Sequence, residues 1–220
     1  MRMTFCYDVE SLDYVILQIL VILQPSYLLE KMVFSLETAI SQDIKSVNDD
    51  NRYDGALNFV CCSVQYPNSW YLKQVVQNNR DQIFQEYVVL YISLDILCVR
   101  NAKYCPCNAS KSKGKFIDAN MDNIDFIFAP TVSNYRRTDK MLSCCPTDGQ
   151  AEILIENNIP LKYINGIAVE DKCVAARVCA MLKMHSIQNV PVYIAPDVLS
   201  TEWSSLVKDG RKPQEEKYNC

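Results

Sequence analysis

Glycine is scarce in this chain, and this scarcity limits the loops and binding sites that the chain can form. Only five of its 220 residues are glycine, at positions 55, 114, 149, 166 and 210. Loops that bind nucleotide phosphates need clustered glycines, because their backbone N–H groups must approach the ligand closely. No two glycines lie close enough here to form such a loop. We therefore exclude P-loop NTPases, Rossmann dinucleotide-binding proteins and kinases, and a G-x-S-x-G nucleophile motif is also absent.

The only histidine, His185, limits hydrolytic chemistry in the same way. A Ser-His or Cys-His hydrolase would have to use this residue. His185 follows Val174, Val178 and Leu182 at spacings typical of one helix face. We interpret it as a residue packed at the edge of the core. The sequence thus predicts no enzyme, no catalytic residue and no cofactor.

The charge balance argues against a polyanionic partner. The chain has a net charge of −4 and a pI near 5.1, whereas nucleic-acid-binding proteins usually carry a basic face. Basic side chains concentrate only at Lys111, Lys113 and Lys115 and at the pair Arg136-Arg137. We interpret these as solvated loops, so no nucleic-acid partner is expected.

The most apolar segment runs from Tyr14 to Leu23. It is too short to span a bilayer and contains Gln18. Acidic residues precede it and Pro25 follows it, unlike the arrangement of a secretory signal peptide. We predict a buried helix here, with no membrane span and no secretion. The glycosylation sequon Asn108-Ala109-Ser110 is therefore expected to be silent.

Hydrophobic periodicity predicts one α+β domain over residues 1–220. Helices over 8–24 and 25–42 would form an N-terminal helical arm spanning 8–45. The core, 46–220, would hold an antiparallel β-sheet or sandwich and a late C-terminal helix over 170–186. A further helix is expected within 70–86. Strands are predicted in the segments rich in β-branched and aromatic residues: 56–66, 86–99, 123–132, 151–158, 162–169 and 190–196.

Eleven cysteines are the second unusual count. Structural zinc sites commonly use two ligand pairs, each with two to four residues between the ligands. Cys105-x-Cys107 is tighter than this, and Cys144-Cys145 has no spacer. A four-thiolate zinc cage built from these four residues remains an alternative, although no metal site is specified by the spacing. A C-x-x-C redox motif is absent.

The odd total means that at least one thiol has no partner within a monomer. Several cysteines lie in polar, proline-marked loops or near the chain ends, and we interpret KYCPCNASK, residues 103–111, as a solvent-facing loop. Disulfides between chains are therefore expected, with ordinary reduced thiols in these loops as the alternative. Cys98, Cys173 and Cys179 are predicted to be inert buried thiols. The interchain candidates are Cys6, Cys61, Cys62, Cys105, Cys107, Cys144, Cys145 and Cys220.

Residues 189–197, NVPVYIAPD, follow the predicted C-terminal helix. This stretch resembles the occlusion-body matrix proteins of insect viruses, the polyhedrins and granulins, in which a late helix leads into a Pro-x-Val-Tyr-Ile strand and an acidic turn. The present sequence lacks the extra residue between proline and valine, a departure that suits a divergent relative such as a nudivirus protein. The resemblance covers about 25 of 220 residues. The matching positions are Pro191, Val192, Tyr193, Ile194 and Asp197.

The resemblance implies a structural protein that assembles into a crystalline, disulfide-reinforced occlusion body. Its partners would be further copies of itself and virions, in the nucleus or cytoplasm of an infected host cell. Alkali would dissolve the crystal, because tyrosine and lysine titrate near pH 10. The net charge would move from −4 to roughly −20 near pH 10.4.

Two alternatives stay open. The helical arm, 8–42, could offer an apolar face to a partner, as in a non-enzymatic intracellular interaction or regulatory domain. The third hypothesis is a Cys-ligated zinc protein or enzyme that uses Cys105, Cys107, Cys144, Cys145 and His185.

Overall fold

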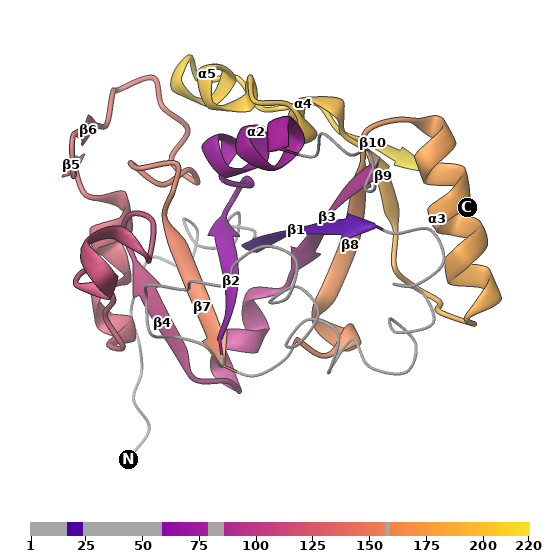
Figure 1. Cartoon of the computed structure of the whole chain (residues 1–220), viewed down its shortest axis with the longest axis horizontal. Helices are drawn as coiled ribbons and strands as arrows, with labels where there is room; N and C mark the ends of the chain where they lie inside the picture. The colour runs from indigo at the N-terminus through magenta and orange to yellow at the C-terminus, as the bar shows by residue number, and fades with distance from the viewer. Residues whose placement is uncertain (1–16, 24–58, 79–85, 157–158) are drawn as a thin grey trace.

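The structure is a computed structural model that describes residues 17–23, 59–78, 86–156 and 159–220 (Figure 1). The predicted helix over 25–42 and Cys6 lie outside these residues.

An eight-stranded sheet forms the centre of the fold. Its strands follow the order β10-β9-β8-β3-β1-β2-β7-β4, and all neighbours are antiparallel except the parallel pair β8–β9. A separate hairpin pairs β5 with β6. The strands are β1 (Leu17–Leu23), β2 (Phe59–Val64), β3 (Glu86–Ile92), β4 (Ala102–Cys105), β5 (Thr131–Val132), β6 (Tyr135–Arg136), β7 (Glu152–Glu156), β8 (Ile164–Val169), β9 (Val192–Ile194) and β10 (Glu216–Tyr218).

Helices cover one end and one edge of the sheet. In Figure 1, α2, α4 and α5 lie at its upper end, and α3 lies along the edge formed by β9 and β10. The helices are α2 (Ser69–Asn78), α3 (Lys172–Met184), α4 (Pro196–Leu199) and α5 (Trp203–Lys208), and the 3₁₀ segments are η2 (Leu94–Cys98), η3 (Lys111–Gly114), η4 (Met121–Phe128) and η5 (Leu161–Tyr163). Asp171 starts α3, because its side chain accepts a hydrogen bond from the Val174 N–H at 2.9 Å.

The sheet consists of two parts that meet at a short junction. Strand β1 pairs with β3 along all seven of its residues. It pairs with β2 only at Leu17↔Val64 and Gln18↔Ser63. The part β10-β9-β8-β3-β1 and the part β2-β7-β4 therefore diverge beyond Ser63.

The three strands β2, β7 and β4 have two different faces, because successive side chains in a strand alternate. One face carries Val60, Cys62, Ile153, Ile155 and Tyr104, which belong to the main core. The opposite face carries a smaller apolar cluster, in which loop residues pack against the sheet. That cluster contains Cys105, Cys107, Ala109 and Leu154, with Phe59, Cys61 and Ile117 packed against it.

The predicted α+β class with an antiparallel sheet and a late helix is confirmed. Helix α3 lies inside the predicted 170–186, and α2 begins within one residue of the predicted 70–86. Strands β2, β3, β7, β8 and β9 each fall inside a predicted strand segment.

Element predictions are wrong in four places. Residues 94–98, inside the predicted strand 86–99, form η2, and residues 103–105, at the start of the predicted loop 103–111, belong to β4. Residues 17–23 form strand β1 and not part of a helix. A short, continuously apolar run fits a strand inside a sheet as well as a buried helix, and here the pairing with β3 decides between them. Residues 121–128 form the 3₁₀ segment η4, so that only the end of the predicted strand 123–132 is extended, as β5.

Within the described residues, no helix has the length and apolar character needed to cross a membrane.

Candidate active site

A glutamate lies at the first position of β7, beside the junction of the two sheet parts. Glu152 pairs across the sheet with Ser63 of β2 and with Cys105 of β4. Directly opposed residues of antiparallel strands point to the same face, so these three side chains share the face of the smaller apolar cluster. Glu152 is half-buried. A carboxylate is therefore placed at the end of an otherwise apolar face, where solvent or a ligand can still reach it.

The loop after β4 holds both oxygens of this carboxylate. The Asn108 side-chain amide donates from Nδ2 to Glu152 Oε1 at 3.1 Å. The Ala109 backbone N–H donates to Glu152 Oε2 at 2.8 Å. Two donors from consecutive residues fix the plane of the carboxylate, and such bonds to an ionised acceptor are stronger than neutral ones.

Two buried thiols pack beneath the loop, against the β-sheet. Cys105 and Cys107 are 0% and 1% exposed. The pKa of Cys107 is lowered to about 7, because Cys105 donates to its thiolate and because Lys111 and the Ser133 hydroxyl stabilise the negative charge. The pKa of Cys105 is raised well above its usual value, since its proton is held by Cys107 and the side chain is buried. The pair therefore loses a first proton more readily than an ordinary thiol, and its two sulfurs share the resulting charge.

A second acid, Asp148, lies close by but has a structural role. It is 2% exposed, and its Oδ1 accepts the Gln150 N–H at 3.0 Å in the turn before β7. Burial raises the pKa of this carboxyl. Glu152 is thus the accessible carboxylate of the two.

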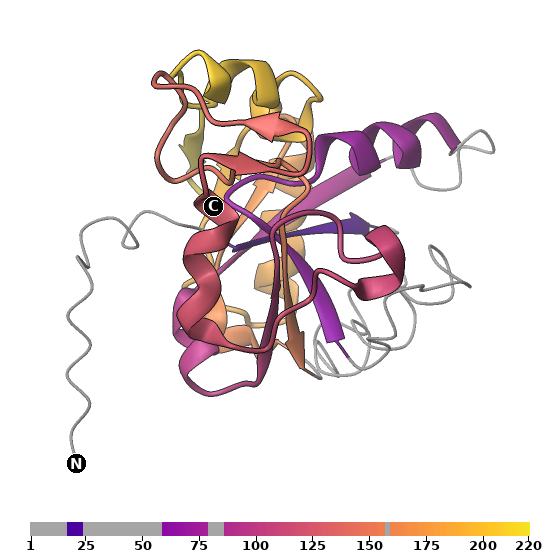
Figure 2. The same ribbon diagram turned by 90° about the vertical axis from the view of Figure 1, so that its left-hand side faces the viewer.

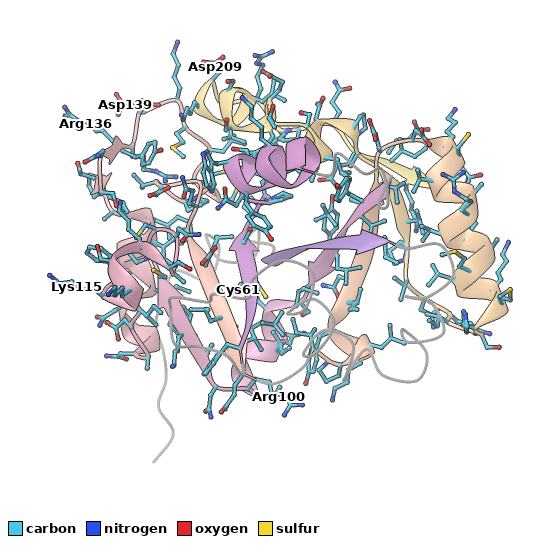
Figure 3. The ribbon with its side chains drawn as sticks, in the orientation of Figure 1. Cys61, Arg100, Lys115, Arg136, Asp139 and Asp209 are labelled. Atoms are coloured by element: carbon cyan, nitrogen blue, oxygen red, sulfur yellow. A yellow bond between two sulfur atoms is a disulfide. The ribbon has the colours of Figure 1, made fainter. Side chains whose placement is uncertain are left out.

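Basic and aromatic side chains border the site on one side. We define the basic rim as residues 111–116 and 131–140, which include Lys111, Lys113, Lys115, Arg136, Arg137 and Lys140, with Asp139 as the only acidic residue. The two segments contact each other, since Lys111 Nζ donates to Ser133 Oγ at 2.8 Å. Figure 2 turns this side toward the viewer, and Figure 3 shows Lys115 and Arg136 projecting outward from it.

The rim also exposes two aromatic rings, Phe116 at 40% and Tyr135 at 41%. Lys208 Nζ lies 5.9 Å from the Tyr135 ring centroid. Positive charge and exposed rings therefore occur together here, which suits contact with phosphates and bases.

Arg137 differs from the other basic residues because it anchors the following loop. Its guanidinium donates to the carbonyl oxygens of Leu142 at 2.7 Å, Ser143 at 3.0 Å and Cys145 at 2.8 Å. These bonds order residues 142–145, which precede β7. Arg137 therefore helps to position the start of β7, the strand that carries Glu152.

Most of the cysteines that were expected to form interchain disulfides are buried. Cys62, Cys105, Cys107, Cys144 and Cys145 are buried, so the prediction of a solvent-facing KYCPCNASK loop is wrong for its two thiols. Their burial follows from the alternation of β2 and from the loops that close over the sheet. Bonds between chains at these residues stay a prediction.

The remaining cysteines also differ from expectation. Cys220 forms a disulfide with Cys179 of the same chain, although Cys220 was an interchain candidate and Cys179 was expected to be a free thiol. Cys61 is half-buried, whereas Cys98 and Cys173, predicted to be buried, are exposed. Cys98 ends η2 and Cys173 lies on the solvent side of α3.

The alternatives that used metal or histidine chemistry gain no support. Among the described residues, no group of three or more His, Cys, Asp or Glu side chains is arranged to hold a metal ion. His185 is half-buried at the end of α3, as its helical spacing predicted.

Sequence reasoning missed Glu152 and Asn108. Glu152 begins the apolar stretch EILIE, where the only local signal is a charged residue at a strand end. Asn108 appeared as part of an incidental sequon. The two residues are 44 positions apart, and only the pairing of β4 with β7 brings them together.

Comparisons with known proteins identify the fold. A family model described as "DarT: ssDNA thymidine ADP-ribosyltransferase, DarT" matches residues 24–200. The structure of Thermus sp. 2.9 DarT in complex with ADP-ribosylated ssDNA is similar with a TM-score of 0.56 and 14% identity, over 83% of this chain and 94% of that chain. The same protein in complex with NAD+ gives a TM-score of 0.53 and 14% identity, over 78% and 89% of the two chains.

Thermosipho africanus DarTG in complex with ADP-ribose has a TM-score of 0.50 and 16% identity, over 84% of this chain. This chain spans half of that longer chain. No curated protein sequence matches.

These findings overturn the occlusion-body resemblance drawn from residues 189–197. That stretch contains the short strand β9, which lies between β10 and β8, followed by α4; different folds can share so short a segment. The predictions of a non-enzymatic protein, of a self-assembling lattice with virions as partners, and of no nucleic-acid partner are contradicted, and so is the interaction-domain alternative. Burial also raises the pKa of Tyr66, Tyr91 and Tyr104. These tyrosines would therefore not ionise near pH 10, although the expected dissolution of a crystal in alkali requires it.

The error about nucleic acid has a physical cause. The net charge of −4 averages over the whole surface and hides the basic rim, which forms only when two separate segments meet. The family model covers most of the chain, and the compared structures share its fold. The chain therefore belongs to the DarT family of ssDNA thymidine ADP-ribosyltransferases.

Proposed function

We propose that this protein transfers ADP-ribose from NAD+ to a thymidine of single-stranded DNA, with Glu152 as the carboxylate that acts at the reacting ribose. The observation that carries the proposal is the position of Glu152. It is half-buried at a strand end beside the sheet junction, and both of its oxygens are held by donors. The family match supplies the reaction.

The reaction makes a specific demand on the site. The bond between the nicotinamide nitrogen and ribose C1′ breaks, and a bond between C1′ and a nucleophilic atom of thymidine forms. Nicotinamide leaves as a neutral molecule with the bonding electron pair, and the thymidine releases one proton. The ribose passes through an oxocarbenium-like state, as in glycoside hydrolysis. A fixed carboxylate stabilises this positive charge and accepts a hydrogen bond from a ribose hydroxyl.

Glu152 suits this role better than Asp148. A group that acts on NAD+ must be accessible and correctly oriented, and Glu152 is half-buried with each of its oxygens held by a donor. Asp148 is buried, and its raised pKa disfavours the charged form. NAD+ as the donor is supported by the family match and by the fold that this chain shares with a DarT whose structure contains NAD+.

The basic rim supports single-stranded DNA as the acceptor. Single strands are bound by positive grooves for the phosphates and by exposed rings on which unpaired bases stack. Lys111 connects this rim to the site, because it is bonded to Ser133 and follows the Asn108–Ala109 pair that holds Glu152. A strand lying along the rim would bring a base to the glutamate.

The proposal is tested by incubating the purified protein with NAD+ and a single-stranded oligonucleotide that contains one thymidine. Mass spectrometry should detect one added ADP-ribosyl group, and an oligonucleotide with cytidine at that position should stay unmodified. Glu152→Gln should lower the transfer rate by about 10²- to 10³-fold, because a preorganised charge-stabilising group is lost.

Glu156→Gln is the matched control. Glu156 ends the same strand, and its Oε2 accepts from Asn101 Nδ2 at 2.6 Å, so this variant should keep wild-type activity. No transfer by the folded wild-type protein, or equal rates for wild type and Glu152→Gln, would refute the proposal.

A further inference from the structure

The loop that donates two hydrogen bonds to Glu152 is itself held in one conformation. The Asn108 main-chain carbonyl accepts the Lys111 N–H at 3.0 Å, and Ala109 is 1% exposed beneath it. The loop starts from the buried Cys105 and Cys107, which pack against Leu154 in the smaller apolar cluster. The two donors to Glu152 therefore belong to a rigid support.

The orientation of the Asn108 amide is determined by its neighbours. Its Oδ1 accepts the Ser110 N–H at 3.1 Å. Nδ2, which can only donate, consequently faces Glu152 Oε1. A flipped amide would place an oxygen against the carboxylate and a nitrogen against an N–H, and both contacts would be repulsive. An asparagine at this position is thus oriented to donate to Glu152 Oε1.

We propose that Asn108 is a positioning residue for the transfer reaction, and that it fixes the Glu152 carboxylate so that its remaining lone pairs face the ribose of NAD+. This inference rests on the proposed function, because it assigns Asn108 a role in the same site. Ala109 N–H bonds Oε2 and Asn108 Nδ2 bonds Oε1, so Asn108 supplies the contact of this loop to the second carboxylate oxygen. Orientation of this kind is worth large factors in rate.

Two substitutions separate positioning from a role in loop stability. Asn108→Asp keeps the Oδ1 acceptor for Ser110 but directs an acceptor at Glu152 in place of a donor. Asn108→Ala removes both bonds and introduces no repulsion. If Asn108 only stabilised the loop, these variants would lower the stability of the protein and leave kcat of the folded enzyme unchanged. A positioning residue would tolerate alanine better than aspartate.

A matched control exists at the other end of β7. Asn101 Nδ2 donates to Glu156 Oε2 at 2.6 Å, and the two residues are linked across the same strand pair by the Glu156 N–H to Asn101 O bond of 2.9 Å. Asn101→Ala removes an asparagine–glutamate bond of the same kind from a place that the reaction does not use.

The kinetic test measures kcat and KM for NAD+ with the thymidine oligonucleotide. We expect kcat to fall about 10- to 100-fold in Asn108→Ala, the effect of one hydrogen bond to a charged group, and further in Asn108→Asp. KM for NAD+ should change little, and Asn101→Ala should match wild type. An Asn108→Asp enzyme that is faster than Asn108→Ala would overturn the proposal.

A structural test keeps this inference separate from the proposed function. In a crystal structure of Asn108→Ala, the main chain of residues 107–111 should superpose on the wild type while the Glu152 carboxylate leaves its plane. A carboxylate that stays in place, or a loop that moves with it, would contradict positioning by Asn108. The crystallographic comparison tests the role of Asn108 even if the protein is inactive. An inactive wild-type protein would refute only the proposed transfer reaction.

Discussion

The disulfide between Cys179 and Cys220 should account for a large part of the stability of the folded chain. It joins helix α3 to the residues just after β10 and closes a loop with a sequence separation of 41. Cross-linking lowers the entropy of the unfolded chain, and a loop of this length corresponds to about 4 kcal/mol at 25 °C. Cys220→Ser removes the bond at an exposed position and leaves no cavity in the core.

Urea unfolding followed by tryptophan fluorescence measures this effect. Trp203 is 2% exposed and lies 5.2 Å from the Tyr66 ring, so its emission should report loss of the core. With a slope of about 2 kcal/mol per molar urea, the midpoint should fall by about 2 M. Adding a reductant to the wild type should give the same shift.

The control for this prediction is Cys173→Ser, which changes an exposed thiol on the same helix that is in no disulfide. Its midpoint should equal that of the wild type. A free energy of unfolding for Cys220→Ser within about 0.5 kcal/mol of the wild-type value, the range of ordinary surface substitutions, would refute the loop-entropy reasoning.

Two further predictions concern the thiol pair and the basic rim. The pKa of Cys107 is lowered from 9.0 to about 7 in the folded protein, so its ionisation adds stability that is fully present above pH 9 and is lost as the pH falls through 7. Urea unfolding at pH 7 and pH 9 should therefore show a smaller rise in Cys107→Ser than in the wild type, and an equal rise would contradict the assignment. Replacing Lys115 and Arg136 by glutamate should weaken binding of a fluorescent single-stranded oligonucleotide and flatten its salt dependence by about 0.7 per lost phosphate contact in a log–log plot. Lys183→Glu on α3 should leave both quantities unchanged, and a rim variant with wild-type affinity would rule out this surface as the DNA site.

Much of the fold follows from local sequence patterns. Strands β2, β3, β7, β8 and β9 were predicted because β-branched and aromatic residues cluster in short runs, and α3 was predicted from its helical spacing. Strand β1 was not, because a short apolar run has no periodicity that separates a buried strand from a helix. Its partners, β3 and β2, lie far away in sequence.

The candidate site could not be predicted, because its geometry depends on strand register. Nothing in the sequence near Asn108 specifies that β4 pairs with β7 so that Cys105 opposes Glu152. The basic rim likewise joins two segments that are linked by the bond from Lys111 to Ser133, 22 residues apart. The occlusion-body resemblance rested on the pattern of one short strand, β9, which carries little information about the rest of the fold.

The central claim is that Glu152 lies against the reacting ribose of NAD+. A crystal structure of this protein with a non-hydrolysable NAD+ analogue tests that claim most directly. We expect a hydroxyl of the nicotinamide ribose within about 3 Å of a Glu152 carboxylate oxygen, the distance of a hydrogen bond, with Asn108 and Ala109 still bound to the carboxylate. An analogue bound elsewhere, or a ribose out of reach of Glu152, would contradict the account.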